Sequence, residues 1–239
     1  MKMINKITKL FKIFKSKLWI KGLLFGIPAY TELDKLISNI KTPESIIDIG
    51  SNKGQFILVI EKKFPNKEIF SFEPILELIN KQKIFFKNKK NIKFFNVGLG
   101  NINQKKKFLI TSRMDSSSFL SISNIGKKNE DYKVKEERII KINKLDNFID
   151  KDTLIRPVLM KIDVQGYELE VLKGALNILS KTDYIIAEVS KQEMYLNQAT
   201  EEKIIDFLGN HGFKVKDYNE WTNIKHTNFS QRDLLFQKI

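Results

Sequence analysis

The stretch that decides the fold is residues 46–54, which read Ile-Ile-Asp-Ile-Gly-Ser-Asn-Lys-Gly. The apolar run before Gly50 is typical of a buried strand, and a helical pattern follows Gly54. A glycine lets the chain turn sharply there, and a ligand can then approach the backbone N–H groups of the helix start. A purely structural turn is the alternative. The turn supplies the first expected cofactor-binding residues, which are Asp48, Gly50, Ser51, Asn52 and Gly54.

The turn also indicates which kind of ligand it suits. The third glycine of the dinucleotide fingerprint is missing, which disfavours a dehydrogenase, and Asp48 precedes the first glycine. An anion at this position suits a cationic ligand better than a pyrophosphate. A sulfonium methyl donor, whose aminoacyl end is cationic, meets that description.

A second acidic residue follows at the spacing that a nucleotide site requires. Glu73 ends the next strand-like run in Phe72-Glu73-Pro74, 23 residues after Gly50. A carboxylate there can accept both ribose hydroxyls, and Pro74 suits the first position of a helix. The alternative role for Glu73 is that of an acid at a helix start. Pro74 also belongs to the expected cofactor-binding set, as do Asn96 and Val97 at the end of the third expected strand and Asp163 at the end of the fourth.

A third motif places charges inside an otherwise apolar strand. Lys161 and Asp163 alternate onto one face of residues 158–164. Buried charges are costly unless they are paired, and they are concentrated at functional sites. Asp163, at the carboxyl end, is expected to project into the crevice where α/β sheets bind ligands, and Glu188 ends the next strand in the same way. A structural pair of Lys161 with Asp163 or Asp48 is the alternative.

The pattern around these motifs predicts one α/β domain over residues 31–239. Strands alternate with helices, which favours a mostly parallel sheet. We expect seven strands in that sheet, with a C-terminal antiparallel hairpin formed by 213–218 and 234–239. Residues 100–157 interrupt the alternation and read as a β-rich flap inserted after the third strand. The other expected strands are 45–49, 68–72, 92–97, 158–164 and 184–189, and the expected helices are 31–40, 54–64, 75–86, 167–179 and 201–210.

The charge distribution sets residues 1–30 apart. The chain has a formal net charge of +14, but only four of its 42 basic residues are Arg, which weakens a nucleic-acid interpretation. Residues 1–30 hold seven Lys, no acid and an apolar stripe at helical spacing. This basic amphipathic extension is expected either to pack on the domain or to contact an anionic membrane surface through residues 1–25. No cysteine is present, which is compatible with a reducing compartment, and no apolar run could span a bilayer. The expected location is cytoplasmic, with a peripheral position at the inner face of the membrane as the alternative.

In these motifs the sequence resembles the FkbM family of methyltransferases, and the resemblance covers most of residues 45–190. The matching segments are the glycine turn at 48–54, Glu73 before Pro74, Ser116-Ser117-Ser118 and Leu145-Asp146. The most specific block is 161–175, Lys-Ile-Asp-Val-Gln-Gly-Tyr-Glu-Leu-Glu-Val-Leu-Lys-Gly-Ala. The resemblance implies a class I, Rossmann-like methyltransferase fold with S-adenosyl-L-methionine as cofactor. It also implies O-methylation of a hydroxyl on a sugar, glycan or secondary metabolite, as in polysaccharide biosynthesis.

Within that resemblance Asp163 is the candidate catalytic base, and Lys161 is the neighbour that orients it or tunes its pKa. No metal is expected, although Asp163, Glu168 and Glu188 form an alternative oxygen-rich metal site. His211 and His226 are expected to be a structural helix-end residue and a solvated loop residue.

Two other functions remain as alternatives. The first is a nucleic-acid methyltransferase, which is disfavoured because Asp163-Val164-Gln165-Gly166 stands where base N-methyltransferases usually have an Asn/Asp-Pro-Pro-aromatic block. The second is a non-catalytic scaffold that binds the cofactor. The expected partner is a small-molecule or glycan acceptor, with no specific nucleic acid, and an oligomer is left open.

Overall fold

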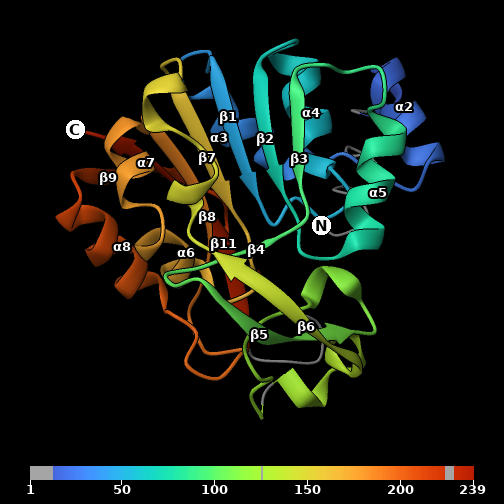
Figure 1. Ribbon diagram of the computed structural model, residues 1–239, viewed down its shortest axis with the longest axis vertical. Helices are drawn as coiled ribbons and strands as arrows, with labels where there is room; N and C mark the ends of the chain where they lie inside the picture. Colours follow the sequence, from blue (N-terminus) through green and yellow to red (C-terminus); the bar gives the residue numbers. More distant parts are fainter. Residues whose placement is uncertain (1–12, 125, 224–228) are drawn as a thin grey trace.

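The computed structural model describes residues 13–124, 126–223 and 229–239. Its centre is a twisted sheet flanked by helices (Figure 1). Along this sheet the strands follow the order β10-β11-β8-β7-β1-β2-β3, with β9 paired to β11. The strands of the sheet are β1 (Ser45–Ile49), β2 (Glu68–Phe72), β3 (Ile92–Phe95), β7 (Val158–Ile162), β8 (Tyr184–Ser190), β9 (Phe213–Tyr218), β10 (Thr222–Asn223) and β11 (Ser230–Lys238).

The chain direction within the sheet explains where a ligand can bind. From β1 the chain proceeds outward through β2 and β3, all parallel, and then returns to the other side of β1 as β7. β7 pairs in parallel with β8, whereas β11 runs antiparallel between β8 and β9. The reversal of strand order lies between β1 and β7, and the carboxyl ends of strands at such a switch point form the usual binding crevice.

Two apolar cores cover the two faces of the sheet. Alternate residues of each central strand point to opposite faces, so that Ile46 belongs to one core and Ile47 to the other. One core is completed by α6 (Glu168–Lys173), α7 (Leu176–Lys181) and α8 (Glu201–Asn210). The other is completed by α2 (Lys17–Leu24), α3 (Asp34–Ser38), α4 (Gln55–Lys63) and α5 (Leu76–Phe85).

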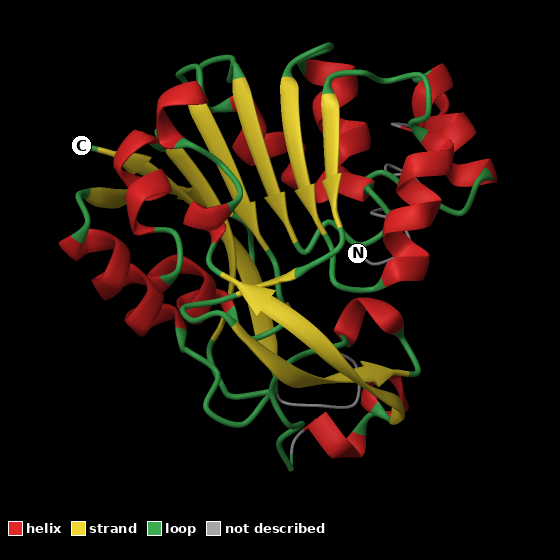
Figure 2. Cartoon of the chain, in the orientation of Figure 1, coloured by secondary structure: helices red, strands yellow, loops and turns green. Residues whose placement is uncertain are grey.

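The insertion forms a second, smaller sheet. It joins β4 (Gly98–Leu99), β5 (Gln104–Thr111) and β6 (Val134–Asn143) in the order β4-β6-β5. This sheet lies beyond the carboxyl ends of β1, β2 and β3 (Figures 1 and 2). Because β4 belongs to it, the third strand of the main sheet leads directly into the flap.

The predicted α/β architecture is confirmed, including the mostly parallel sheet, the terminal antiparallel strands and the β-rich insertion. The single helix predicted over 167–179 is wrong, because the chain forms α6 and α7 with a break near Gly174. A Cβ at Gly174 would lie 2.0 Å from the carbonyl oxygen of Gly100, so the chain must lack a side chain where it passes the flap. The small edge strand β10 was not anticipated.

The described part of the basic N-terminal segment packs on the domain. Trp19 of α2 is 1% exposed, and its indole N–H donates to the carbonyl oxygen of Leu58 on α4 at 2.8 Å. Lys62 lies over the same ring at 3.7 Å from the centroid. Residues 1–12, which hold most of the apolar stripe of the expected membrane-facing extension, lie outside the described residues. Within the described ranges, no helix has the length and apolar character needed to cross a membrane.

We expect Trp19→Ala to lower the free energy of unfolding by about 3–5 kcal/mol, the usual cost of truncating a fully buried aromatic side chain. Urea denaturation measures this. The matched control is Leu24→Ala on the same helix, where the side chain is 84% exposed and the change should stay within about 0.5 kcal/mol. Equal losses from both variants would contradict the packing of α2 as part of the domain.

Candidate functional site

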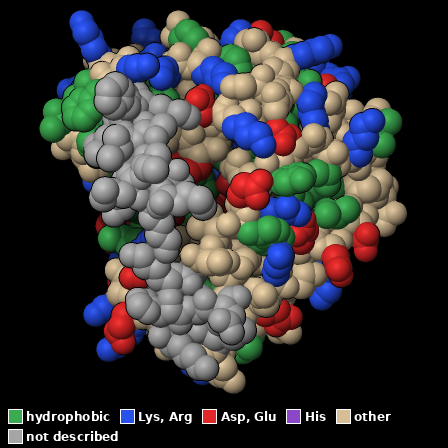
Figure 3. Space-filling view, turned by 180° about the vertical axis from the view of Figure 1, so that it is seen from behind, with side chains coloured by type: hydrophobic (Ala, Val, Ile, Leu, Met, Phe, Trp, Pro, Cys, Tyr) green, Lys and Arg blue, Asp and Glu red, His purple; other side chains and the backbone are tan. Residues whose placement is uncertain are grey.

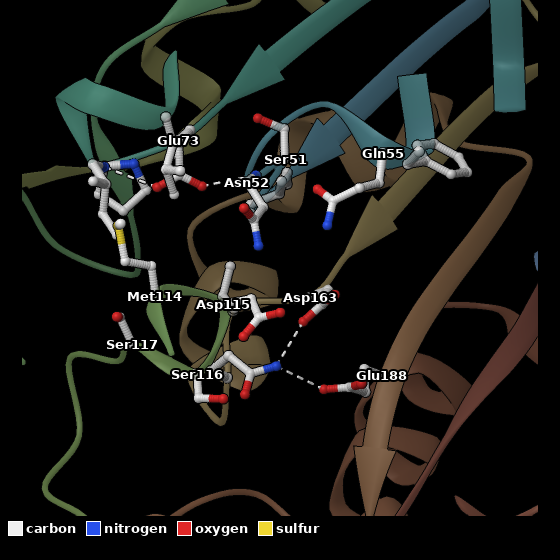
Figure 4. A pocket seen from close by; sticks show the side chains of 18 of the residues that line it. Ser51, Asn52, Gln55, Glu73, Met114, Asp115, Ser116, Ser117, Asp163 and Glu188 are labelled. Carbon is white, nitrogen blue, oxygen red and sulfur yellow. Dashed lines mark hydrogen bonds between the residues drawn. The ribbon is translucent and has the colours of Figure 1, made fainter. Parts of the chain in front are cut away.

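A cavity of about 370 Å³ opens where the carboxyl ends of the parallel strands face the flap. Its walls come from the β1 turn, the end of β2, the ends of β7 and β8, and flap residues around Met114. Figure 4 shows Glu73, Asn52 and Gln55 on one side of this space and Asp115, Asp163 and Glu188 together on the other. Segments that are distant in sequence therefore meet in one site.

The turn after β1 is held by backbone contacts with β2. The amide groups of Gly50 and Ser51 both donate to the carbonyl oxygen of Phe72 at 3.0 Å. Gly50 has a φ of +74°, and a Cβ there would lie 1.9 Å from the carbonyl oxygen of Asp163. Gly50 is therefore required for β1 and β7 to approach each other at the switch point.

The same turn buries a network of neutral polar side chains. The Ser51 hydroxyl accepts from Ser71 and from Gln82, in each case at 2.8 Å. Gln82 also donates to the carbonyl oxygen of Asn52 at 2.6 Å. Gly54 begins α4 with a φ of +90° against the ring of Phe86, and it does not line the cavity. Ser51 and Asn52 do line it.

Glu73 is held in the cavity wall by two backbone donors. One carboxylate oxygen accepts from Asn52 N–H and the other from Ile75 N–H, both at 2.8 Å. The residue is 4% exposed, and burial raises the pKa of Glu73 to about 7 although the two amide donors lower it. Each oxygen retains a lone pair for a ligand in the cavity. Two fixed acceptors at this position suit a pair of neighbouring hydroxyls.

The residues after β3 divide into lining and supporting roles. Val97 and Pro74 line the cavity. Asn96 does not; its side-chain amide donates to the carbonyl oxygens of Glu73 and Pro74 at 2.9 Å each and so fixes the end of β2. An apolar wall lies alongside, made by Ile75, Leu78, Val97, Phe108 and Phe119. Two of these, Phe108 and Phe119, belong to the flap and were not singled out from the sequence.

The Lys161 ammonium group stands between two carboxylates at the switch point. Its Nζ is 3.2 Å from Asp163 Oδ2 and 3.8 Å from Asp48 Oδ1, and it also donates to the carbonyl oxygen of Gly50 at 3.4 Å. Burial alone lowers the pKa of Lys161, but Asp163 and Asp48 outweigh it and the net pKa is raised. Lys161 and Asp163 line the cavity, whereas Asp48 lies behind them.

Asp48 is fully buried and incompletely satisfied. Among the described residues, neither of its carboxylate oxygens has a hydrogen-bond partner, and the contact with Lys161 is a charge contact only. Burial raises the pKa of Asp48 to about 6, although Lys161 lowers it. An additional cation or donor near the β1 turn would stabilise this carboxylate.

The end of β8 adds a second carboxylate beside Asp163. Glu188 accepts from the side-chain amides of Gln165 at 3.0 Å and Gln231 at 2.6 Å. Burial and the neighbouring carboxylate of Asp163 raise the pKa of Glu188 well above its ordinary value. The strand-end position of Glu188 was visible in the sequence. The contacts of Gln165 and Gln231 were not, because they depend on β11 and the β7 turn meeting at one place.

Residues from both ends of the domain also reach the cavity. Tyr30, from the segment before α3, donates to Asp233 Oδ2 at 3.3 Å, and both Tyr30 and Gln231 of β11 line the space. Asp233 is 6% exposed, and burial raises its pKa to about 6. No local pattern marks Tyr30, Gln231 or Asp233, since none of them belongs to a motif.

The alternative metal site is not assembled. Glu168 is held by the turn after β7, where one of its carboxylate oxygens accepts from Val164 N–H and Gly166 N–H at 3.1 Å each. The Gln165 amide separates Asp163 from Glu188. Among the described residues there is no group of three or more His, Cys, Asp or Glu side chains that could hold a metal ion. His211 bonds the carbonyl oxygen of Phe207 at a helix end, and His226 lies outside the described residues.

Comparisons with known proteins agree with this geometry. Residues 48–215 match the model of the methyltransferase FkbM domain. The 2-O-methyltransferase NoeI of Sinorhizobium fredii is 23% identical over 182 residues, covering 73% of this chain and 75% of that protein. The hexuronic acid methyltransferase AglP of Haloferax volcanii is 39% identical over 44 residues, 18% of each chain. The chain is also 23% identical to the AMB antimetabolite synthetase AmbE of Pseudomonas aeruginosa over 71% of its own length, but spans only 9% of that protein.

A solved structure shares the fold. The putative tRNA (m1A22) methyltransferase Sp1610 of Streptococcus pneumoniae, in complex with S-adenosyl-L-methionine, superposes with a TM-score of 0.52 at 11% identity, covering 88% of this chain and 73% of that one. The strand order and this likeness confirm the predicted class I methyltransferase fold.

The residues of the cavity fit S-adenosylmethionine, the cofactor of the family. Glu73 offers two acceptors for a ribose diol, and the wall of Ile75, Phe108 and Phe119 offers an apolar surface for a flat base. The buried oxygens of Asp48, together with Asn52 Oδ1, lack hydrogen-bond partners among the described residues. Asn52 lines the cavity and can accept from the cationic aminoacyl end of this ligand, whereas Asp48 lies behind Lys161 and contributes its negative charge only.

Glu73→Gln is expected to weaken S-adenosylmethionine binding at least about tenfold, on the scale of about 1.5–3 kcal/mol for a lost charged hydrogen bond. Calorimetric titration measures the affinity. Glu77→Gln, an exposed acid four residues further on that does not line the cavity, is the control and should bind normally. Unchanged affinity of Glu73→Gln would remove Glu73 from the ribose site.

The free energy of unfolding should fall as the pH rises from about 5 to 8. The folded-state pKa values of Glu73, Glu168, Asp48 and Asp233 are raised to about 6 or 7, so the folded chain retains protons that the unfolded chain releases. Their stabilising contribution is complete below the unfolded pKa values and is lost as the pH passes the folded values. Denaturant titrations at several pH values test this. Glu73→Gln should flatten the dependence, whereas the exposed Glu202→Gln should not.

Proposed function

The chain belongs to the FkbM family of S-adenosylmethionine-dependent methyltransferases, and we propose that it methylates a hydroxyl group of a sugar or glycan. The observation that carries the proposal is that one cavity holds both Glu73, suited to a ribose diol, and the Lys161–Asp163 pair at the switch point. The sugar-modifying relatives support the acceptor class. NoeI, named a 2-O-methyltransferase, supports a hydroxyl as the acceptor group. AglP, named a hexuronic acid methyltransferase, supports only the sugar class, because a hexuronic acid also carries a carboxyl group.

In this proposal the cofactor supplies an electrophilic methyl group on its sulfonium. Glu73, Ser51 and Asn52 bind the nucleoside part at the β1 and β2 ends, and Asp48 stabilises the cationic end from behind. The apolar side chains of Phe108 and Phe119 exclude water from the adenine ring of the cofactor. Holding donor and acceptor in line supplies much of the rate acceleration in a displacement of this kind.

Asp163 is the proposed proton acceptor. Its Oδ2 is fixed by Lys161 and its Oδ1 by Gln165 at 2.9 Å, and the side chain keeps 21% of its area exposed toward the cavity. An acceptor hydroxyl that bonds Asp163 would therefore be held in one orientation. Its proton would pass to the carboxylate as its oxygen bonds the methyl carbon and the methyl–sulfur bond breaks, leaving the demethylated cofactor as a neutral thioether. Lys161 orients this carboxylate and cannot itself act as the base while its pKa is raised.

The charges of the cavity favour an acceptor that is neutral or cationic around the reacting hydroxyl. The described lining residues include two cations, Lys161 and Arg113. Both are already paired, Lys161 with Asp163 and Arg113 with Asp115 at 2.7 Å. Glu188 accepts from neutral amides and adds no cation, so neither lining cation is left unpaired for an anionic acceptor. A carboxylate or phosphate on the acceptor would find repulsion here and no unpaired cation.

The alternative of a nucleic-acid methyltransferase gains little support. An acidic cavity repels phosphates, and specific binding to nucleic acid needs clustered basic side chains. On the face seen in Figure 3, Lys and Arg side chains are interspersed with Asp and Glu rather than gathered in one stripe.

The acceptor class can be tested with S-adenosylmethionine carrying a ¹³C-labelled methyl group. The purified chain is incubated with neutral sugars, amino sugars, uronic acids, nucleotide sugars, cell-surface polysaccharide and transfer RNA. We expect a labelled methyl ether on a neutral or amino sugar unit, detected by NMR and mass spectrometry. Label confined to RNA, or to a carboxylate as a methyl ester, would refute the proposal.

Asp163→Asn should bind S-adenosylmethionine with near-normal affinity and lose most turnover, about 10²-fold or more, because the acceptor proton has no carboxylate to receive it. Calorimetry and single-turnover transfer to the acceptor found above measure the two properties. Asp115→Asn, another acid of the cavity wall, is the matched variant and should retain more activity. Normal turnover of Asp163→Asn would exclude Asp163 as the base.

A further inference from the structure

Gln165 bridges the two carboxylates at the ends of β7 and β8. Its side-chain nitrogen Nε2 donates to Asp163 Oδ1 at 2.9 Å and to Glu188 Oε2 at 3.0 Å. The dashed lines that end on Asp163 and Glu188 in Figure 4 mark these two bonds. An amide nitrogen has two protons, so both bonds can form at once. Without this donor the two carboxylates would face each other across a partly buried space with no shared partner.

The backbone of Gln165 is held in a conformation that residues other than glycine rarely adopt. Its φ is +55°, in the left-handed region that costs free energy for a residue other than glycine. The carboxylate of Glu168 accepts from the N–H groups on either side, those of Val164 and Gly166. These bonds fix the turn so that the side chain of Gln165 points back to the strand ends rather than outward.

The remaining polar atoms of Gln165 contact the flap or residues bound to it. Its carbonyl oxygen accepts from the Ser118 hydroxyl at 2.7 Å. The hydroxyl of Tyr195 lies 3.0 Å from the side-chain oxygen of Gln165 and 2.7 Å from the carbonyl oxygen of Ser116, and it has one proton to share between them. Tyr195 is 2% exposed, so this link is shielded from water.

We propose that Gln165 is a positioning residue that couples the flap to the carboxylates of Asp163 and Glu188. When the flap is seated, Ser118 and Tyr195 fix Gln165, and its amide holds the two carboxylates apart at their observed places. When the flap moves away, the amide loses its support and the carboxylates lose their common donor. Asp163, the proposed proton acceptor, is therefore correctly oriented only while the flap covers the cavity. This inference rests on the proposed function only in taking the cavity for the active site.

The test uses Gln165→Met, which keeps the length of the side chain and removes the amide. The whole chain, saturated with S-adenosylmethionine, is labelled with ¹³C at its Asp and Glu carboxyl groups and titrated by NMR. We expect the resonances of both Asp163 and Glu188 to move, and the pKa of Glu188 to rise further, with its proton affinity increasing about tenfold. Hydrogen exchange of the amides of residues 116–120 should become about tenfold faster.

Gln231→Met is the matched control. Gln231 donates to the other oxygen of Glu188 but has no described contact with residues 116–118. The Gln231→Met substitution should raise the pKa of Glu188 as Gln165→Met does. The Asp163 resonance and the hydrogen exchange of residues 116–120 should stay as in the unmodified chain. If Gln165→Met gives only the changes seen in this control, the coupling is refuted.

Ser118→Ala provides a second route should Gln165→Met fail to fold. It removes the bond from the flap to the Gln165 carbonyl without touching either carboxylate. Faster exchange of residues 116–120 together with shifted resonances of Asp163 and Glu188 would support the coupling, and unmoved resonances would overturn it. These measurements need no acceptor, so their failure differs from a failure of methyl transfer.

Discussion

The structure depends on a buried ammonium group at the junction of its two central strands. Lys161 is 4% exposed and lies between Asp48 of β1 and Asp163 after β7. A buried ion is tolerated only when opposite charge and hydrogen bonds offset its desolvation, and removal of one partner leaves the other uncompensated. The pair also stands at the switch point, where β1 and β7 approach closely because Gly50 has no side chain. Stability and the placement of the proposed base therefore rely on the same contacts.

The interior charge contrasts with the composition. The chain is strongly basic overall, yet its cavity is bordered by carboxylates whose pKa values burial raises. The ionised form of a buried carboxylate is costly because few positive charges lie near it. A cationic ligand stabilises that form, since it brings the missing positive charge. S-adenosylmethionine is such a ligand. The basic surface and the acidic site thus reflect different constraints, and the net charge predicts little about the substrate.

The site is closed by chain segments that the central motifs do not include. The flap contributes Phe108, Phe119 and the serines that contact Gln165, while Tyr30 and Gln231 come from opposite ends of the domain. In the proposed function the strand ends and the flap side chains Phe108 and Phe119 face the cofactor, whereas Tyr30 and Gln231 lie near Asp163 and Glu188 on the acceptor side. This division explains how one fold can serve many acceptors, since its loops can change while the strand ends are retained.

The sequence by itself determined the order of strands and helices and the identity of the strand-end residues. Alternating apolar runs report burial directly, and Gly50, Glu73, Lys161 and Asp163 stand in local patterns that short-range chemistry dictates. Only the tertiary structure decided which residues face the cavity. The predicted residues Asp48, Gly54 and Asn96 lie behind it, whereas Tyr30, Gln165 and Gln231, which were not predicted as site residues, line it. The tertiary structure also decided the break between α6 and α7, which arises where Gly174 meets the flap backbone. These features come from contacts between segments far apart in the chain, and no local pattern records such contacts.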